Sequence, residues 1–124
     1  LEAARIHYLP NVADVPPEPP ARRLAPPRPV IGALGRMVEK KGFDDFLEAL
    51  RRLQGDGREF TAVLAGDGPE RARLEASAKG LPVRFPGWLD DARPFWKEID
   101  LFCLPSRSEP FGLVLIEAMA QGLP

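Results

Sequence analysis

Cysteine and histidine are almost absent from this chain of 124 residues, which has one of each, Cys103 and His7. A single cysteine excludes an internal disulfide, which fits a reducing compartment. Because Cys103 lies in an apolar run, we expect an inert, buried thiol rather than a nucleophile. His7 has no second histidine with which to bind a metal, and we interpret it as structural.

The chain also lacks a strong net charge and a long apolar run. Its formal net charge of -1 gives no argument for a nucleic-acid partner. No run approaches the roughly 20 apolar residues of a transmembrane helix, and no signal peptide is recognisable. The length fits one domain or part of one. The chain begins without methionine and stops where a helix would lead into another strand, so we expect a fragment of a larger protein.

Proline is concentrated near the start of the chain. Eight of the twenty residues from Pro10 to Pro29 are proline, which removes backbone donors and disfavours both a helix and a central strand. We interpret residues 1–29 as an entrance segment and linker, with a short strand at 6–10 and a turn at 11–14. Arg22, Arg23 and Arg28 are expected to be solvated, with phosphate binding as the alternative.

From residue 30 onward, short apolar runs alternate with helical patterns. The runs at 30–34, 60–65, 83–85 and 100–104 are typical of buried parallel strands. Helices are predicted to begin near residues 43, 70, 91 and 111. This order predicts right-handed βαβ units and an α/β fold with a Rossmann-like parallel sheet and flanking helices. The helical residues expected to face inward are Phe43, Phe46, Leu47, Leu50, Leu53, Phe95, Trp96 and Ile99.

The loop after the first predicted strand, residues 35–42, is glycine-bounded and basic. Gly35 and Gly42 permit a close approach of the backbone to a ligand. Arg36 and Lys41 would then point two cations into the crevice at the carboxyl edge of the sheet, where open α/β folds bind ligands. Lys40 is expected to face solvent. A solvated basic loop is the alternative.

The loops after the second and third strands give weaker signals. Gly66, Gly68 and Pro69 form a tight turn that starts a helix, which could serve packing alone. The sequence Gly87-Trp88-Leu89 could border a planar base, although Trp88 taken by itself favours a place in the core.

The stretch from Pro105 to Ala120 holds two carboxylates, Glu109 and Glu117, with seven residues between them. Glu109 precedes a proline and therefore stays in the loop, and Gly112 lets the chain turn into a helix whose first N–H groups suit an anion. Glu117 lies about 7.5 Å farther along the helix axis. It would be costly to bury without hydrogen bonds, which ribose hydroxyls could donate. A side chain that reaches solvent is the alternative.

Several ligand-binding motifs are missing. The dinucleotide fingerprint G-x-G-x-x-G, the Walker A motif and D-x-D do not occur. Two cations, a helix terminus and two carboxylates together suggest a diphosphate flanked by hydroxyl-rich rings, which describes a nucleotide sugar. Without D-x-D, a carboxylate-held metal is unsupported, and protein cations would neutralise the leaving group.

From residue 30 to residue 124 the chain resembles the C-terminal, donor-binding domain of GT-B fold retaining glycosyltransferases, the "glycosyl transferases group 1" family. The matching motifs, in the family's order and spacing, are Gly35-Arg36 with Lys41-Gly42, Gly66-x-Gly68-Pro69, and Pro105-Ser106-x-x-Glu109-Pro110-Phe111-Gly112 with Glu117-Ala118-Met119-Ala120. The domain would be truncated at its C-terminus. The chain departs from the family at its entrance, where it has Asn11-Val12-Ala13 instead of the frequent Asn-Gly-Val.

The resemblance implies a role for each site residue. Arg36, Lys41 and Glu109 would be catalytic, with the two cations on the departing diphosphate and Glu109 on the donor sugar. Glu117 would hold the ribose hydroxyls. The remaining donor contacts would come from Gly35, Gly66, Gly68, Gly87, Trp88, Leu89, Phe111, Gly112 and Leu113.

The resemblance also implies partners and a setting. It implies a hexosyltransferase reaction with a UDP-sugar as donor, no cofactor, no metal and no nucleic-acid partner. The acceptor, a glycan, lipid or small molecule, would be bound by an N-terminal domain absent from this chain, in polysaccharide or lipopolysaccharide biosynthesis. The location would be cytoplasmic, with peripheral attachment to the inner face of the membrane left open. Without that domain the fragment should bind donor weakly and not turn over. The alternatives are a non-catalytic nucleotide-sugar or phosphate-binding module, an epimerase, and a phosphorylase-like enzyme.

Overall fold

The computed structural model describes residues 15–18, 20–22 and 26–124. The strand predicted at 6–10, the turn at 11–14, His7 and Arg23 lie outside the described residues. From Val30 onward the elements alternate between strand and helix, as the sequence predicts.

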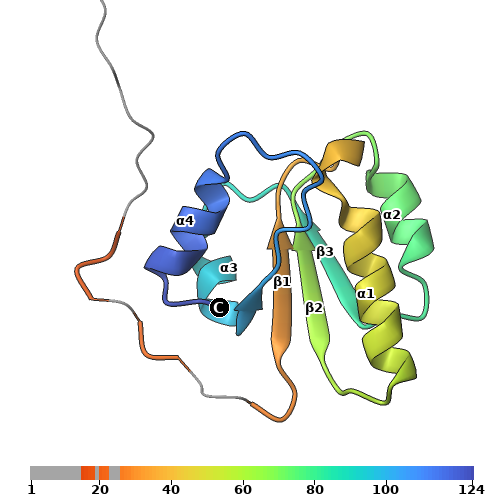
Figure 1. Cartoon of the computed structure of the whole chain (residues 1–124), viewed down its shortest axis with the longest axis horizontal. Helices are drawn as coiled ribbons and strands as arrows, with labels where there is room; N and C mark the ends of the chain where they lie inside the picture. Colours follow the sequence, from red (N-terminus) through yellow and green to blue (C-terminus); the bar gives the residue numbers. More distant parts are fainter. Residues whose placement is uncertain (1–14, 19, 23–25) are drawn as a thin grey trace, which may run out of the picture.

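In the described part of the chain, four parallel strands form the sheet. They are β1 (Val30–Leu34), β2 (Thr61–Ala65), β3 (Val83–Gly87) and β4 (Leu101–Phe102), in the order β3-β2-β1-β4. Parallel pairing brings the carboxyl ends of all four strands to one edge. Figure 1 shows the loops that leave these ends gathered at that edge. The predicted α/β class and parallel sheet are confirmed.

Helices cover both faces of the sheet. The helices α1 (Phe43–Gly55) and α2 (Arg71–Ser77) lie on one face, and α3 (Arg93–Glu98) and α4 (Leu113–Ala120) lie on the other (Figure 1). A short 3₁₀ helix, η2 (Glu39–Lys41), precedes α1 inside the predicted basic loop. The chain therefore forms three layers, typical of a doubly wound fold.

Strand residues divide the core into two clusters by pointing alternately to the two faces. Ile31 and Ala33 pack with α1 and α2. Gly32 faces the other way, where a Cβ would come within 2.6 Å of Ile99 Cγ2. Each helical residue predicted to face inward is buried except Leu53, which is partly buried at the end of α1.

Two strand predictions are wrong in extent. The strand β3 continues through Pro86 and Gly87, beyond the run at 83–85 that was predicted as the strand. Because β3 is an edge strand that pairs only with β2, the missing N–H of Pro86 can face away from the sheet without loss of pairing. The strand β4 has only two residues, fewer than the apolar run suggests.

Arg22 corrects the expectation of a solvated arginine. Its guanidinium donates to the carbonyl oxygens of Trp96 (2.8 Å), Ile99 (3.2 Å) and Gln121 (2.8 Å). These carbonyls lie at the C-terminal ends of α3 and α4, where helices leave carbonyls unpaired and favour a cation. Desolvation by burial lowers the pKa of Arg22. Arg28, by contrast, is exposed as predicted and pairs with Glu59 at 3.0 Å.

No helix in the described part of the chain is both long enough and apolar enough to cross a membrane.

Candidate functional site

A hollow of about 570 Å³ opens at the carboxyl edge of the sheet. Its walls come from the loops after all four strands and from the first turn of α4. The lining residues are Leu34, Gly35, Arg36, Lys41, Gly66, Trp88, Leu89, Ala92, Glu109, Leu113 and Val114. Eight of the predicted site residues are therefore brought together in one cavity: Gly35, Arg36, Lys41, Gly66, Trp88, Leu89, Glu109 and Leu113.

Lys41 and Glu109 form an ion pair in this hollow. Their side chains are 19% and 23% exposed, so the pair is partly shielded from water. The Lys41 ammonium holds the pKa of the Glu109 carboxyl below its ordinary value, with help from the Ser106 hydroxyl at 3.1 Å and the Gly112 N–H. Glu109 is thus a carboxylate at neutral pH, fixed beside a cation.

The basic loop is anchored through its backbone. Gly35 N–H donates to Ala65 O (3.1 Å), and Met37 N–H donates to Asp67 O (2.8 Å). The Met37 side chain is fully buried, whereas Lys40 is exposed as predicted. Arg36 is exposed and lines the hollow. The Arg36 and Lys41 cations are therefore carried by a loop whose backbone is hydrogen-bonded to the loop after β2.

The glycines of the second loop are explained by packing against the first loop. Gly66 has φ 119°, and a Cβ there would lie 1.9 Å from Gly35 O. A Cβ on Gly68 would lie 2.5 Å from Met37 O. Gly66 also lines the hollow, but Gly68 does not. In this structure Gly68 therefore packs against the basic loop, and its predicted contact with the donor stays a prediction.

The N-terminus of α4 faces the hollow. Gly112 is the N-cap, with φ 74° and no side-chain cap, and Leu113 and Val114 line the cavity. The first N–H groups of a helix lack internal partners and carry the positive end of its dipole. Phe111 is 52% exposed and is not a lining residue.

Trp88 overturns the interpretation that favoured the core. Its side chain is 70% exposed, and it stands at the wall of the hollow beside Leu89. The preceding Gly87 is buried and accepts a hydrogen bond from Gly66 N–H at 2.8 Å. The chain therefore leaves β3 in a fixed direction and presents the indole at the surface.

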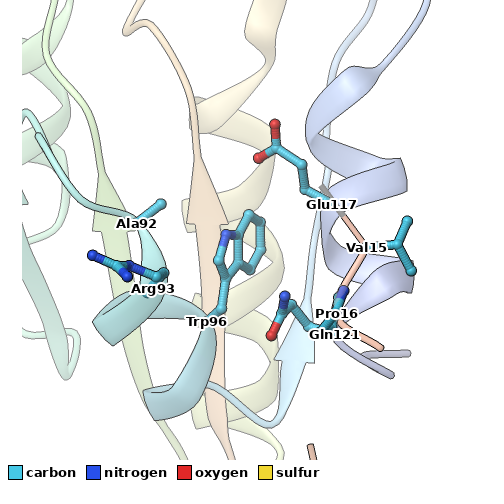
Figure 2. Close-up of a pocket in the computed structure, with 7 residues that line it drawn as sticks. All are labelled: Val15, Pro16, Ala92, Arg93, Trp96, Glu117 and Gln121. Atoms are coloured by element: carbon cyan, nitrogen blue, oxygen red, sulfur yellow. The ribbon is translucent and has the colours of Figure 1, made fainter. Parts of the chain in front are cut away.

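Glu117 lies in a neighbouring depression of about 370 Å³ rather than in the hollow itself. Figure 2 shows Glu117 and Gln121 on the α4 side and Trp96 on the α3 side, with Val15 and Pro16 of the entrance segment nearby. Ala92 lines both cavities, which makes them adjacent. The outward apolar residues of α4, Leu115, Ile116 and Met119, are exposed, so the buried face is the one built on Ala118.

Some residues at the site carry no role in the sequence prediction. Ser106 contacts Glu109, and Arg107 joins two loops through contacts described below. Both lie inside the Pro105–Gly112 motif, which was the available signal. Cys103 is partly buried, and desolvation raises the pKa of its thiol, as expected of an inert cysteine.

Comparison with known proteins gives consistent matches. Residues 28–124 match the family described as Glycosyl transferases group 1. The chain is 45% identical over 100 residues to the lipopolysaccharide core biosynthesis glycosyltransferase LpsE of Rhizobium meliloti. This alignment covers 77% of this chain and 28% of LpsE. Among solved structures, this chain is similar to HepE of Anabaena in complex with UDP and glucose, at 29% identity and TM-score 0.69. The superposition covers 79% of this chain and 28% of HepE.

A third match covers the whole chain. The apo form of the lipopolysaccharide outer core galactosyltransferase WaaB superposes with TM-score 0.76 at 25% identity, over 100% of this chain and 37% of WaaB. The chain thus spans 28% to 37% of the length of these three proteins.

Proposed function

Since this chain belongs to the glycosyl transferases group 1 family, we propose that it binds the nucleotide-sugar donor of a retaining glycosyltransferase. The acceptor is bound by parts of the protein outside these residues, because the chain spans about a quarter to a third of its relatives. The fragment alone is expected to bind donor weakly and not to catalyse transfer.

The observation that carries this proposal is the meeting of Arg36, Lys41 and Glu109 around one hollow with the N-terminus of α4. Two cations and a helix N-terminus favour an anion with several negative oxygens, such as a diphosphate. The carboxylate beside them favours a hydroxyl-bearing ring, because carboxylates accept hydrogen bonds from hydroxyls. A nucleotide sugar joins both chemistries in one molecule.

In the proposed arrangement the diphosphate lies near Arg36 and Lys41 and the donor sugar near Glu109. The nucleoside extends toward Ala92, which borders both depressions. The ribose hydroxyls then reach Glu117, and the base lies against Trp88 and Leu89. The hollow and the adjacent depression, about 570 and 370 Å³, have the size of small-ligand sites.

The chemistry follows from where charge develops. As the bond between the anomeric carbon and the diphosphate oxygen breaks, negative charge grows on the leaving group and positive charge on the sugar ring. Arg36, Lys41 and the α4 terminus stabilise the former. No D-x-D occurs in the sequence, so we propose that these groups suffice and that no divalent metal or other cofactor is needed. The acceptor hydroxyl then forms its bond on the face that the diphosphate left and gives its proton to the departing diphosphate oxygen, which gives retention.

A UDP-sugar is the donor we propose, and HepE, which was solved with UDP and glucose, supports it. The similarity to LpsE supports a place in lipopolysaccharide or polysaccharide synthesis. A lipid-linked acceptor would place the whole protein in the cytoplasm at the inner face of the membrane.

Calorimetric titration of the chain with UDP, GDP and ADP tests the proposal. We expect a preference for UDP, equal affinity with magnesium and with EDTA, and a loss of affinity in Lys41→Ala and in Glu117→Ala. Lys40→Ala is the matched control, since Lys40 is the exposed neighbour outside the hollow. Wild-type affinity in both site variants would refute the assignment of Lys41 and Glu117 to the donor site. Sugar transfer by the isolated chain would refute the proposal that parts outside these residues are needed to bind the acceptor.

A further inference from the structure

Arg107 joins the loop after β4 to the loop after β1. Its guanidinium donates to the backbone carbonyl of Glu39 at 3.0 Å and forms ion pairs with Asp44 at 2.9 Å and with Asp45 at 2.7 Å. Glu39 belongs to η2, and the two aspartates lie in the first turn of α1. One side chain therefore binds three oxygens on the far side of the basic loop.

Backbone contacts make the same junction. Arg107 N–H and Ser108 N–H both donate to Lys40 O, at 2.9 and 3.4 Å. Close by, a Cβ on Gly42 would lie 2.2 Å from Pro105 O. The residues just before Glu109 are thus in direct contact with the residues on either side of Lys41, and the Arg107 side chain adds three contacts to this junction.

The contribution of Arg107 to global stability is expected to be small. The side chains of Arg107, Asp44 and Asp45 are 42%, 37% and 62% exposed, and exposed ion pairs contribute little to stability because water screens them. Their geometric effect is larger, because a planar guanidinium bound to three oxygens fixes direction as well as distance. Without Arg107 the junction would rest on the backbone contacts and on the Lys41–Glu109 pair itself, and the loop that carries Glu109 could move relative to Lys41.

We propose that Arg107 is a positioning residue, which keeps Glu109 within reach of Lys41 and so prepares the site for the diphosphate and the sugar. Arg107 itself lies outside the hollow and acts through these two residues. The part of this inference that concerns ligand rests on the proposed function, whereas the part that concerns the Lys41–Glu109 pair does not.

The Lys41–Glu109 ion pair can be measured in the absence of any ligand. Carbon-detected NMR titration of the Glu109 carboxyl reports its pKa, and the groups that face this carboxyl are Lys41, Ser106 and the Gly112 N–H. In Arg107→Ala we expect the pKa of Glu109 to rise toward the value measured in Lys41→Met, the variant that lacks the cation of the pair. In Arg107→Lys we expect the pKa of Glu109 to rise less. Asp44→Asn combined with Asp45→Asn removes the carboxylate partners of Arg107 and should have the same effect, which covers the case in which Arg107→Ala does not fold.

The matched control is Arg51→Ala. Arg51 also binds a carboxylate, Glu48 at 2.9 Å, and a backbone carbonyl of another segment, Ser77 at 2.8 Å, but it lies away from the hollow. Its removal should leave the pKa of Glu109 unchanged. An unchanged pKa of Glu109 in Arg107→Lys and in the double aspartate variant would overturn the proposal.

Inorganic pyrophosphate is the ligand probe. We expect Arg107→Ala to weaken pyrophosphate binding by about 10-fold, because a small displacement of catalytic groups is costly. In a chain that already carries Lys41→Ala, the same substitution should cause no further loss of affinity. An equal loss in both backgrounds would overturn the positioning role. If the wild-type chain binds neither pyrophosphate nor UDP, the proposed function fails. The titration of the Glu109 carboxyl still decides whether Arg107 keeps Glu109 paired with Lys41.

Discussion

Lys41 and Glu109 are 68 positions apart in the sequence, yet they form an ion pair. They meet because β1 and β4 are neighbours in a parallel sheet, so the loops that follow these strands leave the same edge side by side. The pair lines the hollow with one cation and one carboxylate. Under the proposed function, a diphosphate in the hollow would share the Lys41 ammonium with Glu109.

The ion pair predicts a specific dependence of stability on pH. Lys41 lowers the pKa of Glu109 in the folded state, so the pair stabilises the fold above the ordinary glutamate pKa. That contribution is lost as the pH falls through the lowered folded pKa. Lys41→Met should therefore destabilise the chain by about 1 kcal/mol at neutral pH, with a difference that shrinks in acid. Urea unfolding at a series of pH values measures it, and a difference independent of pH would contradict the pair.

Gly42 is predicted to be intolerant of a side chain. Its φ is 65°, and a Cβ would lie 2.2 Å from Pro105 O, so the two loops would have to separate. Gly42→Ala should lower the free energy of unfolding by about 2 kcal/mol or more. Gly55→Ala is the control, because nothing lies within 4 Å of its Cβ position and alanine favours the helix. Comparable losses in the two variants, measured by thermal unfolding, would refute the close approach.

Arg22 is predicted to stabilise the described part of the entrance segment on α3 and α4. Arg22→Met should cost about 1–3 kcal/mol, because three helix-end carbonyls lose a charged donor. Arg28→Met, at an exposed arginine paired with Glu59, should change stability by less than about 0.5 kcal/mol. Equal effects in urea unfolding would show that the Arg22 contacts contribute nothing beyond a surface pair.

Trp88 offers a test that separates binding from stability. Because the side chain is 70% exposed, Trp88→Ala should change the free energy of unfolding by less than about 0.5 kcal/mol. Loss of stacking should weaken UDP binding by about 5-fold or more, while pyrophosphate binding stays the same. Unchanged UDP affinity would remove Trp88 from the base contacts.

The sequence predicted most of this architecture because apolar runs and helical spacing are local signals. It predicted the meeting of Arg36, Lys41 and Glu109 because parallel strands release their loops at one edge. It did not predict that Trp88 is exposed or that Arg22 caps two helices, since both depend on packing between distant elements. The edge position of β3, which admits Pro86 into a strand, is likewise a property of strand order and has no local signature.

The most direct test of the central claim is to map UDP onto the chain by amide NMR. The account predicts that the largest shift changes fall on residues around the hollow and the adjacent depression: Gly35, Arg36, Lys41, Gly66, Trp88, Leu113, Val114 and Glu117. The amide chemical shifts of exposed α1 residues, such as Arg51 and Arg52, should not change. Shift changes concentrated outside these two cavities, or no change at millimolar UDP, would contradict a donor site at the carboxyl edge of the sheet.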